Sequence, residues 1–347
     1  MTRGRVWPWL LSVPLAALLL YLALRGVDWH GVWHTIAGAR WGFVAAGCGC
    51  SCLSFFLRAL RWRILLNAEE RLSIGFVFSA NMAGYLGNAF LPARAGELVR
   101  TLVVSARSSL SKTYVLTTAL GERLMDAIAL VLWSSLILLR ADAKPRWIGD
   151  LSRTTAALAA AGALAIAVLP HTENLCRNLL RRLALPAAMK ERLLRFADQV
   201  LLGVRAFHNL GRFLGFAVLT VAIWMTDAFG TMLGAYGLHL HFSFTLAMLL
   251  IAGMGLGSAL PSTPGYVGIY QFVAVTVLTQ FGISRDAALA YSLVAQASAY
   301  VTTLALGLPS LYYARSAASS SSAAAALVKL STPKTANASV DPGSSPQ

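Results

Sequence analysis

The chain alternates between long apolar blocks and short segments that hold most of its charged residues. At about 1.5 Å of rise per residue, each block is long enough to cross the roughly 30 Å hydrocarbon core of a bilayer as a helix. The predicted crossings are residues 7–24, 41–57, 113–139, 151–169, 213–236 and 287–312. The blocks are continuous, whereas half-buried strands alternate apolar and polar residues, so the pattern predicts an all-α, polytopic membrane bundle.

Two further apolar segments are interrupted in ways that a straight helix does not tolerate. Residues 75–106 contain Pro92 among several polar side chains, and residues 244–281 contain prolines and glycines close together. Interrupted backbone at membrane depth persists only where it is buried in protein or lines a wet cavity. We therefore expect each segment to form a re-entrant or discontinuous helix pair.

These broken segments take matching places in two halves of the chain. The first lies between the crossings at 41–57 and 113–139, and the second lies between those at 213–236 and 287–312. Because the first half starts outside and the second starts inside, the broken segments enter from opposite faces, which makes an inverted repeat. Inverted repeats with broken helices are typical of alternating-access carriers, whose site lies near the bilayer midplane.

Composition and charge place the chain in a membrane and orient it there. Hydrophobic residues make up 57% of the chain and charged residues only 12%, which excludes a water-soluble protein. The net charge of +15 comes mostly from segments between crossings, where it marks the cytoplasmic side, so nucleic acid is not the expected partner. We assign Arg58, Arg61, Arg63 and Arg71, which follow the second crossing, to such a cytoplasmic loop.

The same rule predicts a multi-pass protein of the bacterial inner membrane with both termini in the cytoplasm. Residues 1–315 form the membrane domain, with a basic cytoplasmic loop at about 170–212, and the Ser/Ala/Pro-rich residues 316–347 are expected to be a disordered tail. Within the basic loop, apolar residues at helical spacing indicate an amphipathic helix that lies on lipid or packs on the bundle. The N-terminal apolar run ends in Arg25 without a cleavage site and is interpreted as an uncleaved anchor.

A row of charged residues follows the break in the first broken segment. Arg94, Glu97 and Arg100 repeat every three residues after Pro92, so in a helix they share one face, with Glu97 between two guanidinium groups. Arginine forks bind phosphate bidentately, and free N–H groups at the start of a helix favour the same anion. We interpret these residues, together with Asn88, as part of a site for an anionic headgroup.

Two of the predicted crossings, 113–139 and 213–236, also contain charge. Glu122, Arg123 and Asp126 lie within one turn or so of each other in the first, and Asp227 lies in the second. An isolated charge costs about 3 kcal/mol at the bilayer centre, so these side chains must pair or meet water. We treat all four as candidate substrate-binding residues, with Asp227 a candidate partner for an arginine. The alternative is an ion-pair lock between helices without a substrate role.

The second broken segment supplies a third set of candidate substrate-binding residues: Pro261, Pro264, Gly265, Gly268 and Gln271. Prolines remove amide donors and glycines permit left-handed backbone, which frees carbonyl and N–H groups to face a ligand. The alternative is a kinked packing element.

Two other chemistries are not expected. Cysteines cluster within residues 48–52 without a histidine, so we interpret them as small buried thiols and expect neither a metal nor a cofactor. An intramembrane serine protease would need Ser258 beside His239 or His241, but those histidines fall in a short loop predicted to be outside.

Together the motifs resemble the transmembrane, flippase-like region of lysylphosphatidylglycerol synthases. The resemblance rests on N-x-x-x-P-x-R-x-G-E-x-x-R from Asn88 to Arg100, E-R-x-x-D from Glu122 to Asp126 and P-x-x-P-G-x-x-G from Pro261 to Gly268, over about residues 5–315. It implies translocation of an aminoacyl-phospholipid, a polyprenyl-phosphate sugar or a hopanoid-type lipid by a stand-alone member without the soluble synthase domain. The family often has an acid near Gln271, where this chain has an amide.

We therefore predict a translocase of lipids or lipid-linked precursors that is not an enzyme. Its expected partner is an anionic phospholipid or a polyprenyl-phosphate-linked lipid in the membrane, and a homo-oligomer is left open. The alternative is a membrane-embedded transferase that acts on a lipid phosphate, because Glu122 and Asp126 lie beside an arginine. A scaffold without translocation is a further alternative.

Overall fold

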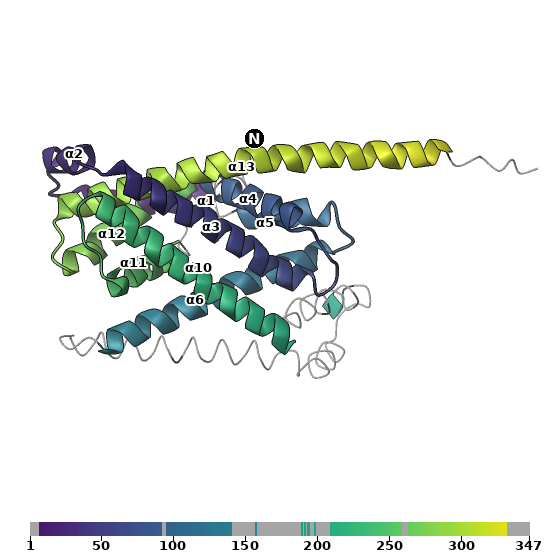
Figure 1. The fold of residues 1–347 in the computed structure, drawn as a ribbon, viewed down its shortest axis with the longest axis horizontal. Helices are drawn as coiled ribbons and strands as arrows, with labels where there is room; N and C mark the ends of the chain where they lie inside the picture. The colour runs from purple at the N-terminus through teal and green to yellow at the C-terminus, as the bar shows by residue number, and fades with distance from the viewer. Residues whose placement is uncertain are drawn as a thin grey trace, which may run out of the picture.

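A computed structural model gives the architecture of the chain (Figure 1). It describes residues 7–91, 95–140, 209–258 and 263–331, with a few single positions between 157 and 198. The elements, in chain order, are α1 (Trp7–Leu24), α2 (Trp29–Ala37), α3 (Trp41–Leu66), α4 (Ile74–Phe90), α5 (Gly96–Ser105), α6 (Lys112–Arg140), α10 (Leu210–Gly237), α11 (Phe244–Gly257), the 3-10 turn η4 (Pro264–Tyr266), α12 (Ile269–Gln280) and α13 (Arg285–Ser331). These described elements are all helical, which confirms the predicted all-α bundle. The predicted crossing at 151–169 and nearly all of the basic loop lie outside the described residues.

Long apolar helices form the body of the molecule. Among the described residues, α3, α10 and the part of α13 up to Tyr313 are long and apolar enough to cross a membrane. A fourth candidate span is the pair α1 and α2, which is bent by 83° between Leu24 and Trp29. Helix α6 occupies the predicted crossing at 113–139 but is not in this group, because charged side chains lie along it.

Helices α3 and α10 pack antiparallel at the centre (Figure 1). At one end the backbone N–H of Arg40 donates to the carbonyl of Gly237 at 2.7 Å. Further along, a Cβ on Gly47 would lie 3.0 Å from the carbonyl oxygen of Gly230. Glycines at both contacts let the two backbones approach closely, as they do in tightly packed membrane helices.

The second crossing is longer than predicted. The assignment of Arg58, Arg61 and Arg63 to a cytoplasmic loop is wrong, because α3 continues through all three to Leu66. Trp62 and Leu66 are completely buried there, so this stretch has an apolar face that packs inside the bundle. Arginines are tolerated within such a helix when acids on facing helices pair with them.

Both broken segments form helical hairpins, as predicted. In the first, α5 folds back along α4 so closely that a Cβ on Gly96 would lie 1.9 Å from the carbonyl oxygen of Gly84. In the second, α12 folds back along α11, and a Cβ on Gly257 would lie 3.3 Å from the side chain of Val273. Small residues at the contacts therefore set the close spacing of each hairpin.

The two halves pack on each other reciprocally, as an inverted repeat requires. Helix α4 of the first hairpin packs on α13, and α11 of the second hairpin packs on α6. Each hairpin follows the C-terminal end of α3 or α10, and these helices are antiparallel, so the hairpins enter from opposite ends. Their inner ends meet at Tyr300, whose ring lies 6.5 Å from that of Phe90 and whose hydroxyl lies against Gly265.

Each half also has its own apolar core. Buried residues including Trp62 and Val104 join α3 to the first hairpin and α6. A larger cluster, which includes Leu250 and Leu278, joins α1, α2 and α10 to the second hairpin and α13.

Two helical segments were not predicted. Helix α2 is capped by Asp28, whose carboxylate accepts hydrogen bonds from the N–H groups of His30 and Gly31. Helix α13 continues to Ser331 through the Ser/Ala run that we assigned to a tail, since alanine is the strongest helix former. The predicted disorder of the remaining residues, 332–347, falls outside the described part of the chain.

Candidate functional site

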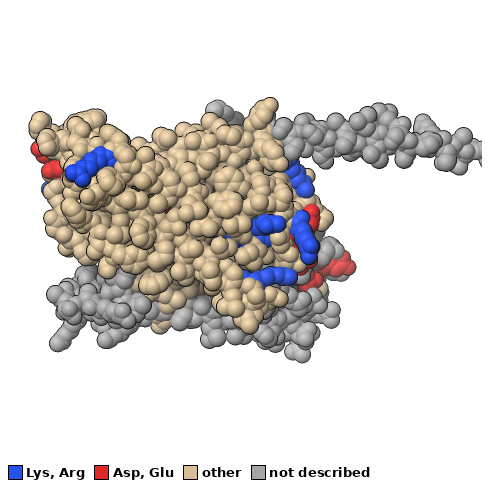
Figure 2. All heavy atoms as spheres, in the orientation of Figure 1, with Lys and Arg blue, Asp and Glu red and all other residues tan. Residues whose placement is uncertain are grey.

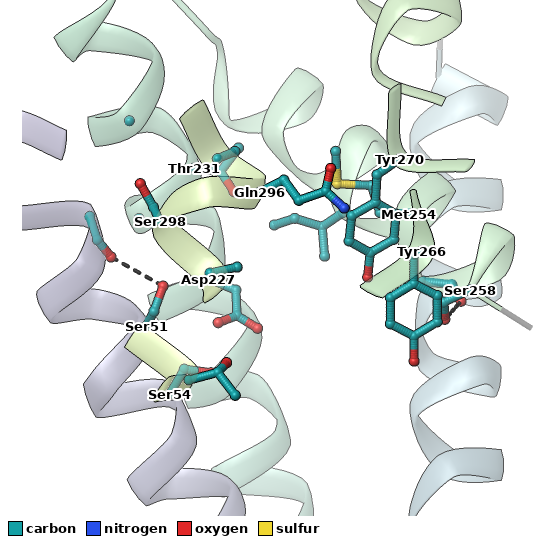
Figure 3. Close-up of a pocket in the computed structure, with 18 of the residues that line it drawn as sticks. Ser51, Ser54, Asp227, Thr231, Met254, Ser258, Tyr266, Tyr270, Gln296 and Ser298 are labelled. Atoms are coloured by element: carbon teal, nitrogen blue, oxygen red, sulfur yellow. Dashed lines mark hydrogen bonds between the residues drawn. The ribbon is translucent and has the colours of Figure 1, made fainter. Parts of the chain in front are cut away.

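A cavity of about 510 Å³ lies between the two halves of the molecule. Residues from α3, α4 and α6 of the first half and from α10, α11, η4, α12 and α13 of the second line it. Figure 3 labels lining residues of α3 and of the elements of the second half. Its polar lining includes Ser51, Ser54, Arg58, Asn88, Arg123, Asp126, Asp227, Thr231, Ser258, Tyr266, Tyr270, Gln296, Ser298 and Tyr300. Its volume falls within the range of about 300–1,000 Å³ that is usual for small-molecule sites.

Arg61 anchors a buried ion-pair network beside this cavity. Its guanidinium donates to Glu122 at 3.0 Å and to Asp126 at 2.6 Å, and it also lies over the ring of Phe216. The arginine and both acids are buried, although Arg61 lies on α3 and the acids on α6. A forked guanidinium between two carboxylates satisfies three buried charges that would be costly if isolated.

Arg100 extends the network into the first hairpin. It donates to the second oxygen of Glu122 at 3.0 Å and to the side-chain oxygen of Asn81 at 3.1 Å, and it pairs with Glu97. Glu97 also accepts from Arg123 at 2.9 Å. Among the described residues, Glu97 thus lies between the guanidinium groups of Arg100 and of Arg123 on α6, while its predicted neighbour Arg94 lies outside them.

Arg58 joins the two halves of the molecule. Its Nη2 donates to the carboxylate of Asp227 on α10 at 2.6 Å, and its Nη1 lies 3.7 Å from Asp126 on α6. It also lies over the ring of Trp224. Asp227 therefore pairs with an arginine, as predicted, and the pair lies at the wall of the cavity.

The described network balances four arginines against four acids: Arg58, Arg61, Arg100 and Arg123, with Glu97, Glu122, Asp126 and Asp227. The positive face that we expected at Arg94, Glu97 and Arg100 is not present in the described part of that segment, because acids neutralise Arg100, while Arg94 itself is outside it. Of the four arginines in the network, the side chain of Arg123 is the most exposed, at 28%, and it lines the cavity.

The third set of predicted residues builds a turn at the cavity. Gly265 and Gly268 have φ of +68° and +88°, and a Cβ on Gly265 would collide with the hydroxyl of Tyr300. Gln271 accepts a hydrogen bond from the N–H of Gly268 at 2.8 Å and donates to Gln296, whose own amide donates to the carbonyl of Gly265 at 2.7 Å. Gln271 is buried and stabilises the turn without lining the cavity, whereas Gln296 lines the cavity.

The predicted site residues therefore fall into four groups. Asn88, Arg123, Asp126, Asp227 and Gly265 line the cavity. Glu97, Arg100 and Glu122 lie behind it in the ion-pair network, and Gly268 and Gln271 hold the turn. Arg94 and Pro261 are outside the described residues, as is the side chain of Pro264.

Other residues of the site were not predicted from the sequence. Arg58 and Arg61 were assigned to a loop, although their spacing of three continues the helical pattern that ends with Leu66. The aromatic and amide residues Tyr266 and Gln296 were not singled out, since isolated polar residues in apolar helices have many structural uses. The partner of His239 among the described contacts is the carbonyl of Gly38, which does not match the arrangement of a serine protease.

Comparison with known proteins agrees with the membrane fold and corrects one expectation. The family model described as "Lysylphosphatidylglycerol synthase TM region" matches residues 9–307. A curated relative, "Glycosyltransferase AglD" from Haloferax volcanii, is 32% identical over 117 residues, which are 33% of this chain and 19% of that protein. The chain thus spans about a fifth of that relative, and no solved structure matches it.

The expectation that the chain is not an enzyme is contradicted by the glycosyltransferase name of this relative. The match to the family covers most of the chain and links it to a lipid-related function in the membrane. Helices long enough to span a bilayer accord with that assignment. This multi-pass membrane protein belongs to the family of the lysylphosphatidylglycerol synthase transmembrane region.

Proposed function

We propose that this protein binds the phosphate-bearing headgroup of a lipid, or of a lipid-linked precursor, in the cavity between its two halves and passes it across the bilayer. The observation that carries the proposal is the position of the cavity, where the inner ends of two oppositely directed hairpins meet. Sites at the interface of inverted repeats serve alternating access, because one half can rock against the other around a fixed ligand.

Arg123 is the proposed contact for the phosphate. Its Nε donates to Oε1 of Glu97 at 2.9 Å, and the side chain is partly exposed at the cavity. An arginine has five N–H donors, so a guanidinium that holds one carboxylate retains donors for a phosphate oxygen. Asn88 and Asp126 line the same cavity and are proposed to orient the ligand.

The proposed rocking motion needs a contact between the halves that can open. Arg58 on α3 and Asp227 on α10 form such a contact at the cavity wall. A headgroup that competes for Arg58 or Asp227 would weaken this contact. It would then bind more tightly to the conformation in which the contact is open, and such a difference in affinity is what shifts a conformational equilibrium.

We further propose a bacterial inner membrane location with both termini in the cytoplasm. Figure 2 shows charged side chains at the two ends of one face, with a broad belt between them that carries almost none. Arg63, Arg71, Arg107, Lys112 and Arg212 lie at or near the end where α3 finishes and α10 begins. By the positive-inside rule this end faces the cytoplasm.

A second candidate function is transfer of a group to or from a lipid phosphate in the same cavity. The glycosyltransferase relative favours it, although the match covers a third of this chain. Product formed in detergent from a lipid-linked sugar donor, where transport has no meaning, would support this candidate. Loss of that product in Asp126→Asn, with retention in Glu69→Gln at an exposed position, would place the reaction in the cavity.

Native mass spectrometry of the purified protein tests headgroup binding. We expect phosphate-bearing lipid to copurify with the wild type and to fall about tenfold in Arg123→Ala, since a hydrogen bond to a charged group is worth about 1.5–3 kcal/mol. The exposed Arg71→Ala removes the same charge away from the cavity and should retain the lipid. Equal lipid content in all three proteins would contradict the proposal.

A further inference from the structure

We propose that the cavity recognises a sugar on this headgroup, with the sugar ring against Tyr266 and Tyr270 and its hydroxyls bonded by Gln296 and the hydroxyl-lined wall. The inference rests on the proposed function and deepens it, because it names the chemical class of the headgroup. Three features of the cavity carry it: an aromatic platform, a rigid amide and a lining whose charges cancel.

The aromatic platform lies beside the turn of the second hairpin. The rings of Tyr266 and Tyr270 are stacked, with 5.1 Å between their centroids and 13° between their planes, and both line the cavity. Tyr85, Trp224 and Tyr300 add further aromatic lining. An aromatic face carries negative potential and attracts the positive ends of C–H bonds, which a sugar ring presents in a row on one of its faces.

Gln296 supplies a polar group held in a fixed position. Its side chain bonds to Gln271 and to the carbonyl of Gly265, so the amide is fastened to both α12 and the turn η4. A hydrogen-bonding group that is already ordered loses little conformational entropy when a ligand binds. The ordered Gln296 amide is therefore suited to a hydrogen bond with a ring hydroxyl at one position.

The opposite wall is rich in hydroxyl groups. Figure 3 shows Ser51, Ser54 and Ser298 on the other side of the view from the two tyrosines. Asp227 lies next to these serines. Ser51 donates its hydrogen to the carbonyl of Gly47 at 3.3 Å in its own helix. A hydroxyl that donates in this way keeps its lone pairs to accept from the hydroxyl of a ligand.

The charges of the lining argue against a cationic headgroup. Two arginines, Arg58 and Arg123, and two acids, Asp126 and Asp227, line the cavity. Both acids contact Arg58 within 3.7 Å, so neither offers an uncompensated charge to an ammonium group. Their remaining lone pairs can accept from neutral hydroxyls, which is the chemistry that a sugar provides.

Equilibrium binding to the full chain in nanodiscs tests the inference, with radiolabelled geranyl phosphate and geranyl-phosphate-glucose as probes. We expect the wild type to bind the glucose-bearing probe about tenfold more tightly, a difference typical of a few added contacts. Tyr270→Leu should lose this preference, so that the two probes bind it with about equal affinity. Tyr236→Leu, a partly exposed tyrosine outside the cavity, is the matched control and should keep the preference.

Ser51→Ala gives a milder test that leaves the platform intact, and it should reduce the preference about threefold, as loss of one hydrogen bond does. Glucose 1-phosphate should compete at least about tenfold less well than the geranyl-linked sugar; equal competition would overturn the assignment to a lipid-linked ligand. A preference that is absent in the wild type, or kept in both Tyr270→Leu and Ser51→Ala, would overturn the sugar site.

The failure of this inference differs from failure of the proposed function. Suppose that the wild type binds geranyl phosphate, that Arg123→Ala abolishes this binding, and that the added glucose does not increase the affinity. In that case only the sugar site is wrong. If neither probe binds to the wild type, headgroup binding in the cavity is wrong as well.

Discussion

At the scale of single residues, the site depends on arginines whose charge is matched inside the bundle. Arg61 and Arg100 are completely or nearly completely buried, and each contacts a different oxygen of Glu122. One acid on α6 therefore links α3 to α5. Removal of one partner from such a network leaves the other charged and buried, which costs more than removal of the whole pair.

Arg61→Ala should be strongly destabilising. The change leaves Glu122 and Asp126 without their main partner, and breaking a buried pair costs about 3–5 kcal/mol. Thermal unfolding in detergent should show a large fall in midpoint, whereas the exposed Arg71→Ala should unfold within a degree or two of the wild type. An unchanged midpoint for Arg61→Ala would show that the pairs contribute nothing to stability.

The sequence revealed only part of this network. Glu122, Asp126 and Asp227 were found because acids in apolar helices need partners. Arg58 and Arg61 were misplaced because the positive-inside rule assigns basic residues after an apolar block to a loop. Their true partners are at least 61 residues away in the chain, and only the packing of α3 against α6 and α10 brings them together.

At the scale of elements, the two hairpins depend on glycines where the backbones nearly touch. A Cβ on Gly96 would lie 1.9 Å from the carbonyl oxygen of Gly84, whereas a Cβ on Gly75 in the same hairpin meets nothing within 4 Å. The breaks themselves were predictable, because proline and glycine interrupt a helix in any context. The nine-residue helix α2 was not, since so short a helix is fixed by its Asp28 cap and its packing.

Gly96→Ala should open or destabilise the first hairpin. Its Cβ would overlap backbone atoms of α4, and overpacking of this kind costs about 1–3 kcal/mol or more. Gly75→Ala is the matched control, and it should be neutral or slightly stabilising because alanine favours a helix by about 1 kcal/mol over glycine. Limited proteolysis between α4 and α5 would report the difference, and equal cleavage of both variants would contradict the close packing.

At the scale of the whole molecule, the arrangement of the halves follows from their order in the chain. In each half a long helix precedes a hairpin and a further helix, and the contacts of α4 with α13 mirror those of α11 with α6. This order was visible in the sequence, because matching breaks fell at matching places. The cavity was not, since its lining comes from eight elements that only the fold assembles.

Opposite entry of the hairpins predicts opposite sidedness of the loops that precede them. With the four native cysteines replaced, Glu69→Cys and His241→Cys place single thiols at exposed positions before α4 and α11. In sealed vesicles of one orientation, an impermeant maleimide should label one thiol from outside and the other only after lysis. Labelling of both from the same side would contradict the inverted repeat.

The most direct test of the account is headgroup movement in reconstituted vesicles. A lipid-linked glucose with a fluorescent headgroup would be followed by its protection from a membrane-impermeant reductant. We predict that the wild type moves it, that Arg123→Ala slows the movement about tenfold by removing the proposed phosphate contact, and that the exposed Arg71→Ala does not. No movement by the wild type, or equal rates in all three proteins, would contradict a translocation site in the cavity.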